Sequence, residues 1–254
     1  MAKKIFRQII FYASLLIAWQ ALILLKLFPS YIFPSPAAVF ETLCSGFSDK
    51  TFLIAIGVSL KRIFLGYSLA LIIGTSVGII ICKNEFVSET LGSLILGLQT
   101  LPSICWFPLA ILWFGLNEKA IQFIVVMGAV FSITISTETA IRNIPPLYIK
   151  VGKNFGAKRF VLFREVIVPA ALPHFLNGLK QGWSFAWRSL MAAEILFVSL
   201  GLGYLLTVGR ELNDMSQVIA VIGVIAFISI LFDKILFGKI QANIRKKWGL
   251  INNT

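Results

Sequence analysis

Charge, histidine and cysteine are all scarce in this chain of 254 residues. Charged residues make up 13% of it and hydrophobic residues 58%, against roughly 25% and 45–50% in an average soluble domain. It contains one histidine, and its three cysteines, Cys44, Cys82 and Cys105, form no CxxC pair. These features argue against a disulfide framework and a zinc site, and the composition excludes an ordinary water-soluble enzyme.

Phosphate-binding motifs are absent as well. The sequence contains no GxxxxGKS or GxxxxGKT loop, and no GxGxxG string opens a helix, so it lacks a glycine-rich cradle for a nucleotide. We therefore expect a non-catalytic chain that binds no cofactor and no metal. If it moves a solute, the energy must come from elsewhere.

The positive charge points to a membrane rather than to nucleic acid. Lys and Arg number 23 against 11 Asp and Glu, which gives a net charge of +12. The basic residues lie between apolar blocks instead of forming a stripe on one folded face, as a nucleic-acid binder would require. Such spacing is typical of the charged loops of a membrane protein.

Five uncharged runs are long enough, or nearly so, to cross a bilayer. They cover residues 8–25, 63–82, 90–117, 120–137 and 215–232, and about 20 apolar residues suffice for one crossing. Lipid requires backbone groups to be satisfied internally, so each run is predicted to be helical. Residues 51–60 form either an interfacial helix or an outer extension of the second span.

A sixth crossing is predicted in residues 166–209, which Lys180, Arg188 and Glu194 interrupt. As one helix this segment would be about 66 Å long, so it forms either two crossings or one crossing and an outer broken segment. The positive-inside rule favours one crossing, because the basic segments then share one side. We predict an all-α, polytopic protein with six transmembrane helices, both termini cytoplasmic, and an outer broken segment at about 195–213.

Two features inside the predicted spans suggest a solute pathway. Pro102 and Pro108 predict a broken helix within residues 90–117, and irregular backbone at membrane depth is tolerated where it lines a cavity. The candidate gate is Leu101, Pro102 and Ser103. On a later helix, a polar stripe within about 60° of arc is formed by Gln181, Ser184 and Arg188.

Arg188 has three possible roles. A charged side chain inside a span usually faces the bundle or a water-filled path, and a guanidinium suits the oxygens of nitrate or a sulfonate. Alternatively, Arg188 reaches the outer headgroups or pairs with Glu194. For Arg62, at the outer end of the second span, we expect anchoring in the headgroups rather than a place in a vestibule.

The loop at about 142–168 is basic, and yet it also contains apolar residues such as Phe155 and Phe160. The apolar members need a surface to cover, either a partner protein or the lipid headgroups. Gly156 permits a sharp turn between two short helices. Pro169 and Pro173 suit the first turns of the helix that follows.

This loop resembles the EAA motif of bacterial ABC-importer permeases. Gly156 is followed at the family's spacing by Val166-Ile-Val-Pro169, whereas Lys150, Val151 and Gly152 stand where the family has Glu and two Ala. Further strings resemble the permease branch for nitrate, sulfonates, taurine or bicarbonate: residues 33–36, 59–62 with Gly66, 101–115, 186–194 and 201–204.

The resemblance implies a single permease domain over residues 1–254 in the bacterial cytoplasmic (inner) membrane. It implies two cytoplasmic ATPase subunits that carry ATP and Mg, an extracytoplasmic binding protein, and a second permease copy. The residues it assigns to ATPase coupling are Lys150, Val151, Gly152, Phe155, Gly156, Ala157, Lys158, Phe160 and Pro169. The expected function is import of a small anion or sulfonate; the alternatives are a secondary transporter or a permease for a neutral or cationic vitamin precursor.

Overall fold

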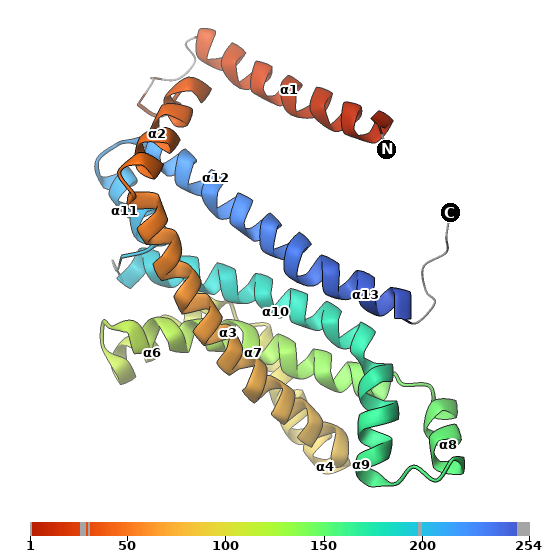
Figure 1. The fold of residues 1–254 in the computed structure, drawn as a ribbon. Coiled ribbons are helices and arrows are strands. Elements are labelled where there is room, and N and C mark those ends of the chain that lie inside the picture. The colour runs from red at the N-terminus through yellow and green to blue at the C-terminus, as the bar shows by residue number, and fades with distance from the viewer. Residues whose placement is uncertain (1, 26–28, 30, 198–199, 248–254) are drawn as a thin grey trace. The chain divides into compact units, whose positions relative to one another are not determined.

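The computed structural model describes residues 2–25, 29, 31–197 and 200–247, and every regular element among them is helical (Figure 1). Packing divides the chain into two compact units. The first comprises residues 1–59 and 194–227, and the second comprises residues 60–193 and 228–254.

The first unit contains the N-terminal helices and the helices that follow residue 194. Its elements are α1 (Ala2–Leu24), α2 (Pro36–Ser48), the first turns of α3 (Thr51–Lys83), the end of α10 (Val168–Phe197), α11 (Leu202–Glu211) and most of α12 (Met215–Phe232). Asp49 accepts a hydrogen bond from the Thr51 backbone N–H at 2.9 Å, and its hydrogen bonds to Thr51 hold the pKa of Asp49 below its usual value. This cap fixes the start of α3, so residues 51–60 extend the second span rather than forming a separate helix.

The second unit holds the remaining helices. In chain order they are the rest of α3, α4 (Glu85–Val87), the π-helical η1 (Ser88–Gly92), α5 (Ser93–Gln99), the 3-10 helix η2 (Ser103–Trp106), α6 (Phe107–Phe114), α7 (Glu118–Arg142), α8 (Pro146–Asn154), α9 (Arg159–Leu162), the π-helical η3 (Phe163–Ile167), most of α10, the last turn of α12, the π-helical η4 (Asp233–Gly238) and α13 (Lys239–Lys247).

The residues that the structure describes contain six membrane spans if one bent pair counts as a single span, as the sequence predicts. Five straight runs qualify: Phe6–Leu24, Thr51–Lys83, Glu118–Arg142, Arg159–Phe197 and Met215–Ile244. The sixth is the pair Glu85–Gln99 and Ser103–Phe114, bent by 104°. The bend falls at the predicted break, where Pro102 is extended (ψ 139°) and precedes η2.

The predicted sixth crossing is one long helical run followed by a short helix. The run Arg159–Phe197 has 39 residues, and α11, with ten residues, is too short to cross a bilayer. Residues 198–199, within the expected outer segment, lie outside the described residues. The segment thus contains one crossing.

Helix α10 begins at Val168, so Pro169 lies in its first turn as expected, whereas Pro173 lies inside the helix. The continuous helical run begins earlier still, at Arg159. Pro169 and Pro173 lie inside the run and lack the N–H that an α-helix needs there. The π-helical η3 directly precedes α10. The π-helical hydrogen-bond pattern of η3 accommodates the loss of the backbone hydrogen bonds that the prolines cannot donate. The helical run therefore continues without a break before the prolines.

Helix α7 is the central element of the second unit. Its span has the largest buried share of the candidate spans, 61%. Small residues join it tightly to α10: a Cβ on Gly178 would lie 2.0 Å from Ser136, and one on Gly128 would lie 2.0 Å from Ser189 Oγ. In lipid such small-residue contacts let helix backbones approach closely, so α7 and α10 form one tightly packed seam.

Headgroup anchoring of Arg62 is wrong. The side chain is 4% exposed, and its guanidinium pairs with Glu118 at the start of α7, with Nε donating to Oε2 at 2.8 Å. Gln122 Nε2 also donates to the Arg62 carbonyl. A charge within a bundle is stabilised by such a partner, which the sequence places 56 positions away.

Candidate functional site

A cavity of about 350 Å³ lies between the break in the bent span, α7 and α10. The break contributes residues 99–103, so the predicted gate residues Leu101, Pro102 and Ser103 all line it. Arg188 lines the same cavity from α10. The remaining lining residues are Met127, Gly128, Phe131, Phe185 and Ser189. The structure therefore brings the candidate gate and the candidate anion-binding arginine together.

The Arg188 guanidinium is exposed and held by its own helix. Its Nε donates to the Ser184 carbonyl at 3.3 Å, and its Cζ lies 4.7 Å from the centroid of the Phe185 ring, a cation–π arrangement. Across the part of the chain that the structure describes, no carboxylate pairs with Arg188. The alternative of a pair with Glu194 is wrong, and the guanidinium is able to take an anionic ligand.

Gln181 and Ser184 lie beside the cavity rather than in its lining. Both are exposed on α10, and Ser184 Oγ donates back to the Lys180 carbonyl at 3.1 Å. The polar stripe is therefore an exposed face of α10 that adjoins the cavity at Arg188.

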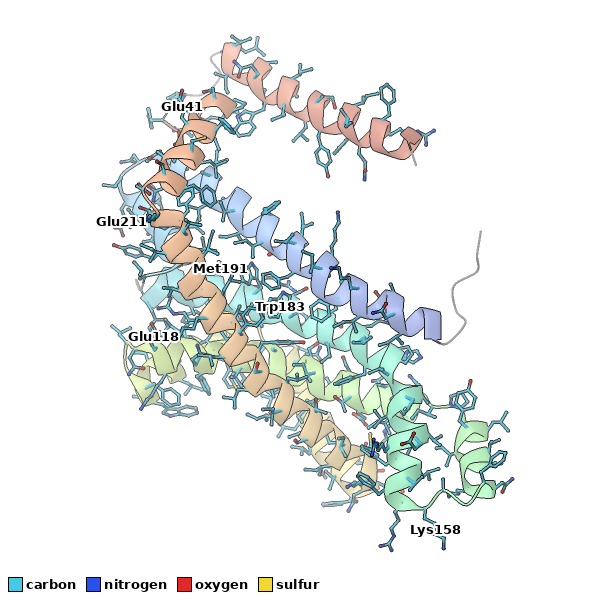
Figure 2. All side chains as sticks on the ribbon, in the orientation of Figure 1. Glu41, Glu118, Lys158, Trp183, Met191 and Glu211 are labelled. Carbon is cyan, nitrogen blue, oxygen red and sulfur yellow. The ribbon has the colours of Figure 1, made fainter. Side chains whose placement is uncertain are left out.

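Residues 146–167, which we call the elbow, contain the predicted turn. Gly156 follows α8 with a φ of +81°, a left-handed conformation that favours glycine. The Gly156 N–H donates to the Lys153 carbonyl and the Ala157 N–H to the Gly152 carbonyl, which is the Schellman pattern of a helix end. Figure 2 shows Lys158 at the tip of the elbow, at the opposite end of this unit from Glu118.

The elbow presents apolar side chains around a groove of about 700 Å³. Phe155 is 87% exposed and Phe160 71%. Of the predicted coupling residues, those that line the groove are Val151, Gly152, Phe155, Gly156 and Ala157. Lys150, Lys158 and Phe160 are exposed elsewhere on the elbow, and Pro169 lies in the first turn of α10. An apolar surface of this kind is typical of a docking site for another protein.

Gly152 has a packing role that the sequence alone does not reveal. A Cβ at this position would lie 2.9 Å from Leu162 Cδ1 and 2.9 Å from Val166 Cγ2. Its lack of a side chain lets α8 lie directly against α9 and η3. The elbow is therefore a packed helical unit rather than a loose loop.

A second polar cluster, which we call the Glu194 cluster, lies in the first unit. Glu194 is fully buried. Ser59 Oγ lies 2.8 Å from both of its carboxylate oxygens and donates to the carboxylate, while the Gly203 N–H donates to Oε2 at 2.9 Å. The Leu202 N–H donates to Ser59 Oγ at 2.9 Å. The carboxylate thus binds the N-terminus of α11, where the helix dipole favours negative charge.

Three contributors to these sites were missed from the sequence. Ser59 and the backbone of Gly203 meet Glu194 only through tertiary packing, so the family-like strings that contain them could not show that they form one cluster. Asn177, by contrast, lies four residues before Gln181 on the same face of α10, and its spacing alone could have added it to the polar stripe. Among the described residues, no group of three or more His, Cys, Asp or Glu could hold a metal.

Comparison with known proteins identifies the family. The profile of the binding-protein-dependent transport system inner membrane component matches residues 66–245. The chain belongs to this family. It is 30% identical to the taurine transport system permease protein of Escherichia coli (strain K12), covering 87% of this chain and 82% of the relative. It is 26% identical to the nitrate import permease protein of Synechocystis, covering 92% and 87%.

The fold is that of solved ABC importers. An inward-facing conformation of the MetNI methionine ABC transporter superposes with a TM-score of 0.65 at 18% identity, covering 78% of this chain and 97% of that one. Members of the family are multi-pass membrane subunits that work with ATPase and substrate-binding partners. The chain is therefore a permease component of an ABC importer.

Proposed function

We propose that this permease imports a small oxyanion or sulfonate, and that Arg188 binds the anion during its passage. The observation that carries the proposal is the guanidinium of Arg188, which lines the cavity beside the helix break and pairs with no carboxylate among the described residues. Its geometry matches the oxygens of a nitrate or sulfonate group. Relatives named as taurine and nitrate permeases support the same substrate class.

In this proposal the energy enters at the elbow. Its exposed aromatic residues and apolar groove dock onto a cytoplasmic ATPase subunit, which carries ATP and Mg, and this chain binds no cofactor. Because η3 runs directly into α10, movement of the elbow reaches the helix that carries Arg188. Closure of the ATPase pair then shifts the permease between inward-open and outward-open states.

The proposed assembly is two copies of this permease with two ATPase subunits and an extracytoplasmic binding protein. Both termini and the elbow lie on the cytoplasmic side, which the basic residues of the elbow favour. Family membership argues against a secondary transporter. A cationic vitamin precursor is disfavoured because Arg188 would repel it.

The test reconstitutes the permease in proteoliposomes with its ATPase subunit and binding protein. Wild type should take up labelled taurine or nitrate only with ATP. Arg188→Gln should lower uptake roughly 10- to 100-fold, because a hydrogen bond to a charged group contributes about 1.5–3 kcal/mol. Lys119→Gln, an exposed change at the start of α7, is the matched control. Unchanged uptake by Arg188→Gln would contradict the role of Arg188.

The elbow is tested with the same components. Phe155→Ala should weaken co-purification of the ATPase subunit, whereas Arg188→Gln should leave it intact. Phe227→Ala removes a comparably exposed aromatic from α12 and should have no effect on ATPase binding. Normal ATPase binding by an elbow stripped of both Phe155 and Phe160 would exclude the docking role.

A further inference from the structure

The polar face of α10 is longer than the stripe of Gln181, Ser184 and Arg188. Asn177 falls within the same arc of about 60°, at 100° per residue, and it is exposed like the other three. From Asn177 to Arg188 the face extends over about 17 Å of helix, roughly half the thickness of the hydrocarbon core. A polar surface therefore continues from the Arg188 cavity toward the elbow end of α10.

Two polar bridges connect the elbow end of α10 to the last helical run, one from Asn177 on the polar face and one from Lys180, which lies about 60° around the helix from Asn177. Gln241 Nε2 of α13 donates to Asn177 Oδ1 at 3.1 Å. Lys180 Nζ lies 2.9 Å from Asp233 Oδ1 at the start of η4, and Figure 1 shows α13 running beside α10. Among the described residues, the other members of the stripe form no polar bridge to this run. The bridging is confined to one end of the polar face.

These bridges are of a kind that opens readily. The Lys180 and Asp233 side chains are 45% and 42% exposed, and ion pairs that are this accessible contribute little to stability. Asp233 also begins a π-helical segment, and η3 supplies another directly before α10. Short π-helical segments inside helices are frequent at functional sites. The last helical run is therefore irregular at the bridge itself, whereas on the α10 side the π-helical segment lies about 15–20 Å away along the helix.

The opposite side of α10 has no such freedom. Its seam with α7 leaves no space for a Cβ at Gly178 or Gly128, so α10 and α7 are expected to move together. The last helical run is held by aromatic packing, with Trp183 against Phe232 at 5.4 Å between ring centroids, and by the two bridges. Phe237 of η4, which is buried, adds a second ring contact to Trp183 at 6.3 Å. Because no such small-residue seam is seen among the described residues on this side of α10, the last helical run is the neighbour that we expect to move relative to α10.

We propose that the Lys180–Asp233 pair, supported by the Asn177–Gln241 hydrogen bond, is an inner latch of the anion path. The latch holds the last helical run over the inner end of the α10 polar face and opens once in each transport cycle. Asp233 also neutralises Lys180, so that Arg188 is the cation presented to the solute and the inner half of the path does not trap it. This inference rests on the proposed function, because it requires that solute passes along α10.

The decisive experiment locks the latch. In a chain with Cys44, Cys82 and Cys105 replaced by serine, Lys180→Cys and Asp233→Cys are joined by a reducible bis-methanethiosulfonate linker. The protein is assayed in proteoliposomes with its ATPase subunit and binding protein. ATP-driven anion uptake should fall roughly tenfold on linking, because the open state is no longer populated, and should return on reduction. Each single-cysteine variant treated with the same reagent is the control.

Full-rate uptake by the linked protein would overturn the latch, because transport would then not require residues 180 and 233 to separate. If the double-cysteine variant is inactive before linking, Asp233→Asn provides the test instead. This variant should lower the number of solutes imported per ATP at least severalfold. Exchange of the two charges, Lys180→Asp with Asp233→Lys, should restore the ratio, and Lys234→Gln, an exposed neighbour, should not change it. A normal ratio in Asp233→Asn would also overturn the latch.

Failure of the proposed function gives a different result. In that case the wild-type permease, assembled with its ATPase subunit and binding protein, imports neither taurine nor nitrate. The ratio of solute to ATP is then zero for every variant, including wild type. If only the latch hypothesis is wrong, the wild-type permease still imports taurine or nitrate.

Discussion

Arg188 and Glu194 lie six residues apart on α10, and their surroundings are opposite. Arg188 is exposed, it borders a cavity, and its guanidinium meets a carbonyl and a ring of its own helix. Glu194 is fully buried, and its carboxylate accepts hydrogen bonds from Ser59 and from the start of α11. One helix thus carries an exposed charge beside a cavity and a buried charge that is hydrogen-bonded within the fold.

The difference teaches how a charge in a membrane helix is to be interpreted. Charged side chains within a span are expensive and are therefore often taken as functional. The Glu194 carboxylate is instead hydrogen-bonded by the protein itself, including a helix N-terminus. These hydrogen bonds offset the free-energy cost of burying its charge. The number and kind of partners, rather than membrane depth alone, separate the two cases.

The largest expected effect comes from removing the buried charge. Glu194→Leu leaves the Ser59 hydroxyl and the Gly203 N–H without their acceptor, at about 1–3 kcal/mol for each unsatisfied group. We expect a loss of several kcal/mol in the free energy of unfolding, measured by thermal unfolding in detergent. Glu194→Gln keeps one acceptor oxygen and should lose less. A Glu194→Leu protein as stable as wild type would erase the contrast between the two charges.

Much of the fold could be predicted because the uncharged runs are long and the bilayer admits few solutions. The helix break at Pro102 and the turn at Gly156 follow from the backbone limits of proline and glycine. Both lie where local chemistry decides the conformation. The co-location of Leu101, Pro102 and Ser103 with Arg188 follows from the packing of α5, η2, α7 and α10, which no single segment specifies.

The misses have a common physical cause. Arg62 looked like a headgroup anchor because its partner Glu118 belongs to another helix. The Glu194 cluster unites α3, α10 and α11, and its glycines matter for the space they leave rather than for any signal in the sequence. The helical run extends back from α10 through η3 and α9 to Arg159, and Pro173 lies inside α10 rather than in its first turn.

A change of intermediate size probes the space around the buried charge. A Cβ on Gly201 would lie 2.5 Å from the Glu194 carboxylate, so Gly201→Ala should overpack the cluster and cost about 1–3 kcal/mol of stability. Gly115→Ala is the matched control, because Gly201 (φ +158°) and Gly115 (φ +71°) both have a backbone conformation that strains a side chain, whereas a Cβ on Gly115 would meet nothing closer than 4.0 Å. Thermal unfolding of both variants under the same conditions measures the difference. Equal stability of the two would show that the cluster has room to spare.

The smallest effect concerns the form of the exposed charge rather than its presence. Arg188→Lys keeps the positive charge but loses the planar fork that binds two oxygens of an anion at once. We expect ATP-driven uptake of taurine or nitrate to fall only about threefold to tenfold, corresponding to about 1 kcal/mol, with thermal stability unchanged because the side chain is exposed. Uptake as low as that of Arg188→Gln would mean that bidentate geometry, and not charge, is what the anion recognises. Uptake equal to wild type would reduce Arg188 to a source of positive potential, which any cation at that position could supply.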